Sequence, residues 1–484
     1  MEAKLLFILL LSSLFEFILN KVTIISPKAL KQQFTNPIKA SYSNFGKIPY
    51  GYTLSGRIYF DPDNIKSDMA CEPIETIKIP KNPSVDQAPI VMIDRGNCTF
   101  VKKVKNVENI GGHLALIIEN VDGEDPSHII MSDDQKRQGE NIHIPAVLIG
   151  FEDGKKIKDF YRKNKDNPDT LKRIIIEVQF EMEHNSNTVN YSIYFSSEYF
   201  NIYKTLKELY HYHVHLDNST TLKPYYVSNY NKYFTNGNEV DNCYSSGRYC
   251  ITPRYDLNIS DGRQILRENL RQKCIYKYAY ETAKNSSVYW NYMGMFYDDC
   301  IGNGTEAKNF TEMCATNTMI QLNVNYLPVH LCIIDSFGIK DINHEEKEYL
   351  TKDNEILKHD IEVKNNHNIW LIPTILINNR TFWGNWNGEN IFEALCAAYK
   401  IKPQVCYDEG AFFKENNTGM SYITIAIITV IVIIINLVIF LVCRNWIKRK
   451  IADKVEATDI NNKINSVVTS YISLKDAKET SSSN

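Results

Sequence analysis

Cysteines are the residues of this chain whose spacing most limits the chemistry available. Eleven occur among 484 residues, and no two lie three positions apart. This spacing excludes the Cys-x-x-Cys redox motif and the common zinc knuckle. Ten of them precede a long apolar run and form an even set, which is typical of disulfides made in an oxidising lumen. We expect structural bridges, and for eight of the ten the sequence leaves the pairing open: 243, 250, 274, 300, 314, 332, 396 and 406.

Other catalytic constellations are missing from the sequence. Neither Gly-x-Ser-x-Gly nor His-Glu-x-x-His occurs, so the motifs of a serine hydrolase and of a zinc peptidase are absent. His211, His213 and His215 alternate, and a strand would place all three on one face within reach of a divalent metal. The aromatic residues around these histidines and the lack of a nearby carboxylate pair indicate that their spacing is a coincidence and not a metal site. We expect no enzyme activity, no metal and no cofactor.

Composition indicates a globular chain of two or three domains. Hydrophobic residues make up 44% and charged residues 23%, with 54 basic and 57 acidic side chains. The net charge of -3 and the absence of a long single-sign run argue against a nucleic-acid-binding protein.

Two apolar segments predict a membrane protein. Residues 5–19 are typical of a signal-peptide core, which gives a signal peptide over 1–20. Tyr422 to Cys443 carries no charge and, as a helix, would extend roughly 33 Å, enough for a bilayer core of roughly 30 Å. Basic residues follow it at once, which favours a type I orientation. The predicted order is a stalk over 409–420, a transmembrane helix over 421–443 and a cytoplasmic tail over 444–484.

The segment 21–183 predicts one α/β module. Apolar spacing indicates a helix that starts at Phe100 and stops at Gly111-Gly112, and another amphipathic helix between the last two strands. The strands are expected at Tyr52–Phe60, Ile90–Asp94, His113–Glu119, Ile144–Ile149 and Ile174–Phe180.

The segment 184–408 predicts a second module that resembles the thioredoxin fold. A strand over Asn190–Phe195 and a helix over Glu198–Tyr210 open it, and a Cys-rich helical insertion of about 130 residues follows. It closes with Trp370–Ile377, which contains Ile-Pro-Thr, and a helix over Ile391–Tyr399. In that fold the proline is cis and shapes the surface beside the redox pair.

The junction between its first strand and first helix decides the chemistry of this domain. A redox-active member needs a low-pKa thiolate there. The sequence is Ser196-Ser197-Glu198-Tyr199-Phe200, which contains no sulfur. We therefore expect a scaffold or a ligand surface and no oxidoreductase.

Several motifs in a consistent order resemble the vacuolar sorting receptors. They are the segments at 43–54 (SNFGKIPYGYTL), 93–100 (IDRGNCTF), 115–118 (ALII), 141–146 (NIHIPA), 246–250 (SGRYC), 269–274 (NLRQKC) and 371–380 (LIPTILINNR). The resemblance implies an α/β protein whose first domain is a protease-associated domain, an open β-barrel with helices. The thioredoxin-like domain with its helical Cys-rich insertion follows it. A single transmembrane helix comes last. The EGF-like repeats of the plant members are absent, since only Tyr407–Met420 separates the last luminal cysteine from the span.

The same resemblance implies a peptide-binding groove in the first domain. Its expected residues are Arg95, Gly96, Asn97, Cys98, Phe100, Asn141, Ile144, Pro145 and Ala146. A guanidinium offers a planar fork of donors to carboxylates or carbonyls, and the turn at Gly96 leaves backbone N–H groups for an extended peptide. The alternative is a surface turn with a stabilising disulfide and a core phenylalanine.

Cys71 and Cys98 are the only cysteines of the first domain, so we expect them to pair. Closing the loop between them would stabilise the fold by about 3.5 kcal/mol in the chain-entropy model and would fix the base of the Arg95 loop. A further hypothesis is that protonation of His113, His128 or His143 near pH 6 weakens binding in this groove.

The tail contains Tyr471-Ile472-Ser473-Leu474. Extended, this motif could place Tyr471 and Leu474 in two pockets of a cytosolic clathrin adaptor by strand addition. Seven sequons are expected to be glycosylated: Asn190, Asn218, Asn258, Asn285, Asn303, Asn309 and Asn416.

Together these patterns favour a type I receptor of the Golgi, endosome and vacuole pathway. It would bind soluble cargo proteins or propeptides in the lumen and present a tyrosine signal to adaptors. A membrane ubiquitin ligase is excluded because the sequence after Cys443 holds no Cys or His for a RING domain. The alternative that stays open is a resident glycoprotein that acts as a redox-inactive folding or adhesion factor.

Overall fold

The computed structural model describes residues 21–480 apart from 36, 64–68, 81–86, 134–137, 217–218, 232–239, 255–258, 302–309, 341 and 409–421. The predicted signal peptide and stalk lie outside the described residues. The chain divides into two compact units, one up to Phe412 and one from Phe413 onward.

Seven strands of the first domain close into a barrel in the order β1-β2-β6-β5-β4-β3-β7. The expected open barrel is therefore corrected. The closing strand is β1, which pairs antiparallel with both β2 and β7 and lies upstream of the first strand that periodicity indicated. The strands are Lys21–Ser26, Ile38–Tyr42, Tyr52–Tyr59, Ala88–Asp94, Leu114–Ile118, Ala146–Ile149 and Ile175–Phe180.

Three neighbouring strands, β4, β5 and β6, run parallel and are almost fully buried, which explains their continuous apolar sequences. The helix α4 (Phe100–Asn109) connects β4 to β5, and its buried Val101, Val104 and Val107 confirm the predicted spacing. The amphipathic helix α5 (Phe151–Lys163) follows β6, also as predicted. The short helices α2 (Lys28–Lys31), η1 (Pro126–His128), η2 (Gln138–Asn141) and α6 (Pro168–Leu171) complete the domain.

The second domain is built on a four-stranded sheet in the order β14-β13-β8-β9. Its strands are β8 (Val189–Phe195), β9 (Thr220–Tyr226), β13 (Thr374–Ile377) and β14 (Arg380–Thr381). The helices α7 (Phe200–His213) and α14 (Gly388–Ala397) pack together. The peptide bond between Ile372 and Pro373 is cis, as the thioredoxin-like pattern predicted.

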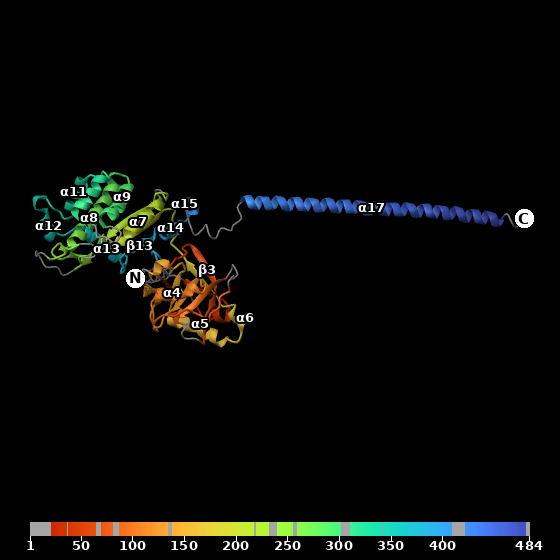
Figure 1. Ribbon diagram of the computed structural model, residues 1–484, viewed down its shortest axis with the longest axis horizontal. Helices are drawn as coiled ribbons and strands as arrows, with labels where there is room; N and C mark the ends of the chain where they lie inside the picture. The colour runs from red at the N-terminus through yellow and green to blue at the C-terminus, as the bar shows by residue number, and fades with distance from the viewer. Residues whose placement is uncertain are drawn as a thin grey trace, which may run out of the picture. The chain divides into compact units, whose positions relative to one another are not determined.

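The Cys-rich insertion is helical, as expected (Figure 1). Its helices are α8 (Gly262–Lys277), η5 (Tyr278–Thr282), α9 (Ser287–Phe296), η6 (Tyr297–Ile301), α10 (Glu312–Gln321), α11 (Tyr326–Ser336), η7 (Ile342–His344), α12 (Glu345–Thr351) and α13 (Glu355–Asn366). A small sheet of β10 (Asn229–Tyr230), β12 (Tyr249–Cys250) and β11 (Cys243–Tyr244) precedes them, and α15 (Val405–Asp408) ends the unit.

All ten cysteines that precede the apolar run are paired. The predicted Cys71–Cys98 bridge is confirmed. The sequence left the other four open, and the structure gives Cys243–Cys250, Cys274–Cys332, Cys300–Cys314 and Cys396–Cys406.

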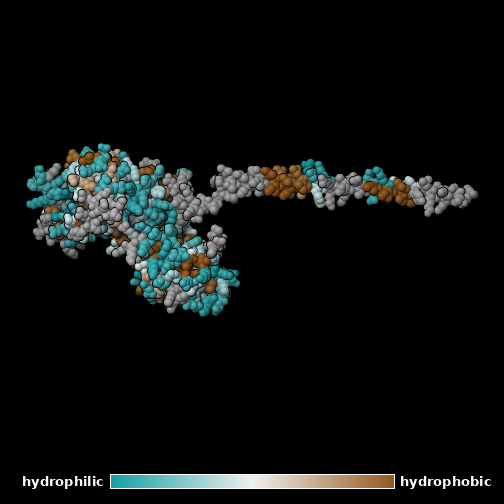
Figure 2. Space-filling model, in the orientation of Figure 1, coloured by the Kyte–Doolittle hydropathy of each residue, from teal (hydrophilic) through white to brown (hydrophobic). Residues whose placement is uncertain are grey.

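The second unit contains the helix α17, Tyr422–Thr480. Figure 2 shows two hydrophobic stretches along it. The exposed apolar side chains of this helix include Ile433, Ile434, Ile435, Leu437, Val438, Ile439, Phe440, Leu441, Val442, Ile460, Ile464, Val467, Val468 and Ile472. Among the described residues, no helix combines the length and the apolar character that crossing a bilayer requires. The side chains of residues 422–432, half of the predicted span, lie outside the described residues.

Candidate functional site

Arg95 follows the last residue of β4 and is fixed by a buried carboxylate. Its backbone N–H donates to the carbonyl of Ile118 at 2.9 Å, and its Nη1 lies 2.6 Å from Oε2 of Glu119. The other Glu119 oxygen accepts from the backbone N–H groups of Asn120 and Val121. The Arg95 side chain remains one-third exposed. Glu119 therefore orients the guanidinium, while part of it stays open to solvent.

The loop after Arg95 exposes backbone in a conformation that the sequence specifies. Gly96 has a φ of +111°, which side chains rarely adopt, and Asn97 lies in the left-handed region at +66°. Cys98 is tied to Cys71, and Thr99 caps α4 by accepting from the N–H of Lys102 at 3.3 Å. The ring of Phe100 lies under the guanidinium, 5.7 Å from it. These contacts pre-order the loop.

The second predicted segment, Asn141–Ala146, lies at the opposite end of α4 from Arg95. Asn141 accepts from Lys105, and His143 contacts Glu108; both partners belong to the second half of the helix. Because α4 has ten residues, the two segments are separated by roughly 15 Å along its axis. An extended peptide of about five residues would span that distance. Phe100 and Ile144 both pack against one buried cluster that joins the two ends.

The three histidines proposed as pH sensors have different surroundings. His143 is exposed, and its Nδ1 lies 3.2 Å from Oε1 of Glu108. Burial acts to raise the pKa of Glu108, but Lys105 and His143 outweigh it, so the pKa is lowered. Burial lowers the pKa of His113. His128 ends a short 3₁₀ helix. Only His143 lies on the predicted groove, and its effect on binding stays a hypothesis.

His211, His213 and His215 do not lie on one strand, in agreement with the interpretation that their spacing is a coincidence. Helix α7 continues to His213, whose Nδ1 is hydrogen-bonded to the buried Tyr191 hydroxyl at 3.1 Å. Within the described part of the chain, no three His, Cys, Asp or Glu side chains gather as a metal site.

At the thioredoxin-like junction the structure places a buried carboxyl group instead of a thiol. Ser196 donates to Glu198 at 3.2 Å, and the Ser197 N–H donates to Asn269 of α8. Burial raises the pKa of Glu198 to about 7, although Ser196 and Arg254 act in the opposite direction. Sequence reasoning excluded a thiolate here and missed this carboxyl group.

The raised pKa of Glu198 predicts a pH-dependent stability. The folded state favours the protonated form, so this stabilisation is full below the ordinary pKa near 4.5 and is lost as the pH rises through about 7. The wild type should therefore be less stable at pH 8 than at pH 5. We expect the free energy of unfolding of Glu198→Gln to fall by about 2 kcal/mol less than that of the wild type between these two pH values, after allowing for solvent screening. Denaturation by urea at several pH values measures it. The exposed Glu355→Gln is the control, and an unchanged pH slope in Glu198→Gln would contradict the assignment.

A seam between the two domains carries further contacts that no motif indicated. The N–H of Gly384 donates to the carbonyl of Ser43 at 2.9 Å, and that of Asn385 to Gly46 at 2.8 Å. The Asn385 side chain accepts from the N–H of Gly46 and donates to the carbonyls of Glu140 and Ile142. The seam therefore reaches the second segment of the predicted groove.

Tyr50 of the first domain forms two further hydrogen bonds across the seam. The Tyr50 hydroxyl donates to the carbonyl of Trp383 at 3.1 Å and accepts from its N–H at 2.6 Å. Lys47 forms ion pairs with Glu389 and Glu393 of α14.

The remaining predicted sites lie in the tail and at the sequons. Residues 471–474 belong to α17, so adaptor binding by strand addition would require this segment to leave the helix. Asn190 and Asn285 are exposed. Asn218, Asn258, Asn303, Asn309 and Asn416 lie outside the described residues.

Comparisons with known proteins agree with the two-domain arrangement. The family model described as vacuolar sorting receptor thioredoxin-like domain matches residues 179–396, and the PA domain matches residues 61–157.

Known relatives are similar to this chain over most of its length, through both domains. Vacuolar-sorting receptor 3 of Arabidopsis thaliana is 26% identical over 83% of this chain and 63% of its own length. Vacuolar-sorting receptor 1 of Pisum sativum has the same identity and the same coverage. The chain thus spans 63% of the length of these relatives. A rice protein with a receptor homology region, a transmembrane domain and a RING domain is 36% identical over only 19% of this chain and 15% of its own.

Proposed function

We propose, from its similarity to the vacuolar sorting receptors through both extended domains, that this chain is a non-enzymatic receptor. It binds soluble proteins in the lumen of the secretory and endosomal pathway and directs them to a vacuole-like or lysosome-like compartment. The observation that carries the proposal is Arg95, whose guanidinium is anchored by a buried carboxylate yet remains open to solvent. The sulfur-free junction at 196–200 supports binding without redox chemistry.

The ligand class follows from the donors that the first domain presents. A guanidinium and a loop with left-handed backbone at two successive residues suit carbonyl or carboxylate oxygens of an extended peptide. Because the disulfide and the Thr99 cap already order the loop, binding costs little additional conformational entropy. Cross-linking of luminal proteins to the full-length chain tests the proposal, and capture of no soluble vacuolar or lysosomal precursor would contradict it.

The proposed receptor is anchored by residues 421–443 and presents Tyr471 and Leu474 to cytosolic clathrin adaptors. The uncharged sequence from Tyr422 to Cys443 and the basic residues after it support a type I anchor. The signal lies in the last third of α17, remote in sequence from the anchor, so an adaptor could engage it away from the bilayer.

We expect Tyr471→Ala to move a several-fold larger fraction of the receptor to the cell surface, because the adaptor loses its aromatic anchor. Surface biotinylation measures that fraction. Ser473→Ala, within the same motif but at a position that supplies no anchor, serves as the control. Equal surface fractions for the wild type and Tyr471→Ala would favour the alternative of a resident folding or adhesion factor.

A further inference from the structure

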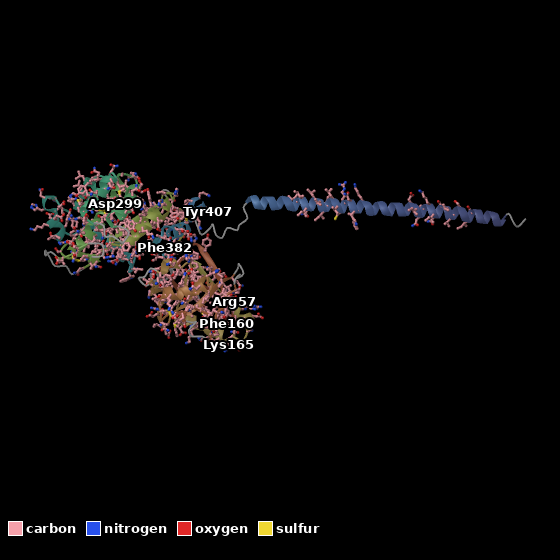
Figure 3. All side chains as sticks on the ribbon, in the orientation of Figure 1. Arg57, Phe160, Lys165, Asp299, Phe382 and Tyr407 are labelled. Atoms are coloured by element: carbon pink, nitrogen blue, oxygen red, sulfur yellow. A yellow bond between two sulfur atoms is a disulfide. The ribbon has the colours of Figure 1, made fainter. Side chains whose placement is uncertain are left out.

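The Cys71–Cys98 disulfide differs from the other four bridges of the described residues in its exposure. Both of its cysteines are half-buried, whereas each of the other bridges contains at least one cysteine that is no more than 4% exposed. These buried cysteines are Cys243, Cys274, Cys300, Cys396 and Cys406. Disulfide bonds are drawn in yellow in Figure 3. A dissolved thiol can therefore approach the Cys71–Cys98 bridge more easily than the others.

A buried lysine lies against one sulfur of this bridge. Lys103 of α4 is fully buried, its Nζ lies 3.6 Å from Sγ of Cys71, and it also donates to the carbonyl of Met69. Within the described part of the chain no carboxylate forms an ion pair with Lys103, and the Asp94 carboxylate is paired with Lys158 at 2.5 Å. Burial lowers the pKa of Lys103 to about 8, although Asp94 acts in the opposite direction, so the amine stays mainly protonated at neutral pH.

The position of this ammonium group decides which sulfur leaves when the bridge is opened. An ammonium gains little from a neutral disulfide sulfur and much more from a thiolate, which carries a full negative charge. A thiolate on Cys71 would supply the counter-ion that the buried Lys103 lacks. Stabilisation of the departing thiolate both speeds its departure and favours the reduced form of the bridge. Lys103 therefore makes Cys71 the leaving group.

The other sulfur belongs to the loop that carries Arg95. Cys98 lies three residues after Arg95, and its N–H donates to the carbonyl of Gly96 at 2.9 Å. Asn97, directly before it, has the left-handed backbone of the loop. Because the bridge to Cys71 is the covalent tie at the base of this loop, opening it releases the loop from that tie.

We propose that Cys98 is a site of thiol–disulfide exchange, at which a small dissolved thiol forms a mixed disulfide while Cys71 leaves as a thiolate paired with Lys103. The incoming thiolate sulfur attacks Sγ of Cys98, the S–S bond breaks, and its electron pair goes to Sγ of Cys71. The small thiol is oxidised and Cys71 is reduced, so no other oxidant or reductant takes part.

The exchange itself does not depend on the receptor function proposed above. Its consequence, a looser Arg95 loop that captures less soluble protein, does rest on that function. Binding to a pre-ordered loop costs less conformational entropy than binding to a loose one, so the modified chain is expected to bind more weakly.

Mapping of the wild type tests the direction of attack. Glutathione is the probe, and it is added to the full-length chain in neutral-lipid nanodiscs after the free Cys443 has been blocked. New thiols are then trapped with N-ethylmaleimide. We expect glutathione on Cys98 and maleimide on Cys71, in roughly tenfold excess over the reverse arrangement.

Trypsin cleaves after Lys78, Arg95 and Lys102, so mass spectrometry reads the two cysteines in separate peptides. Equal labelling of both cysteines, or glutathione mainly on Cys71, would overturn the proposal. Reaction of another bridge before this one would also overturn it.

Replacing Lys103 with methionine removes the charge and keeps the length of the side chain. Half-reduction of the bridge in Lys103→Met should require a roughly tenfold higher ratio of squared reduced glutathione to oxidised glutathione, which corresponds to ~30 mV. Lys105→Met removes the same charge from a half-exposed position of the same helix and should leave the ratio within about twofold. Equal ratios for the wild type and Lys103→Met would contradict the role of the ammonium. The mapping of the wild type decides the matter if Lys103→Met does not fold.

The outcomes separate exchange from capture. Chains that carry glutathione on Cys98 should capture several-fold less soluble protein than unmodified chains, and equal capture would overturn the effect on the Arg95 loop. If neither form captures protein but the exchange still depends on Lys103, the receptor function fails and the exchange site remains.

Discussion

Replacing Arg95 with lysine is expected to lower the capture of soluble luminal proteins by at least tenfold without changing the stability of the chain. Lysine keeps the positive charge opposite the buried Glu119 but loses the planar fork that binds two oxygens at once. Loss of one charge-assisted hydrogen bond corresponds to about 1.5–3 kcal/mol, or roughly tenfold to a hundredfold in affinity. Quantitative cross-linking with the full-length chain, together with its thermal unfolding midpoint, measures both quantities.

Two further variants separate binding from folding. Arg95→Ala should reduce both capture and stability, because Glu119 then lacks its guanidinium partner in a buried position. Arg162→Lys changes an exposed arginine of α5 in the same domain and should alter neither. A normal yield of cross-linked protein from Arg95→Lys would show that the guanidinium is not the binding group.

Asp360→Ala is expected to reduce the free energy of unfolding by about 3–5 kcal/mol, since it breaks a buried ion pair by removing one partner. Asp360 is fully buried on α13 and accepts from Lys273 of α8 at 2.9 Å and from the N–H of Tyr226 at 2.8 Å. Lys273 also donates to the carbonyl of Pro224. These groups join the helical insertion to the edge strand β9. The substitution therefore leaves the Lys273 cation without its counter-ion and the Tyr226 N–H without its acceptor.

Urea denaturation measures this loss. The double variant Lys273→Met/Asp360→Leu removes both charges together and should recover at least half of the lost free energy, because no unpaired charge remains buried. Asp335→Ala, at an exposed position of α11, should change stability by no more than about 0.5 kcal/mol. An Asp360→Ala variant as stable as this control would contradict the structural role of the pair.

Local sequence patterns predicted the elements that do not depend on distant partners. The apolar spacing after Phe100 gave α4, and the Ile-Pro-Thr before an apolar strand gave the cis-proline and β13. Cys71 and Cys98 could be paired because no other cysteine shares their domain. The loop at Arg95 was found from its residues together with the family resemblance.

Features that join distant segments could not be predicted in the same way. Cys274 and Cys332 are 58 residues apart, and only the packing of α8 against α11 brings them together. Glu119 is the last buried residue after β5, with nothing in the local sequence to identify it as the partner of Arg95. Asn385 lies more than 300 positions from Gly46, so neither periodicity nor a short motif could indicate their contact.

The seam between the two domains includes two hydrogen bonds formed by main-chain atoms alone, from the N–H of Gly384 to the carbonyl of Ser43 and from the N–H of Asn385 to the carbonyl of Gly46. Main-chain groups are the same whatever side chain a residue carries. Substitutions of nearby side chains, such as those of Phe382 and Trp386, can therefore leave these two hydrogen bonds in place.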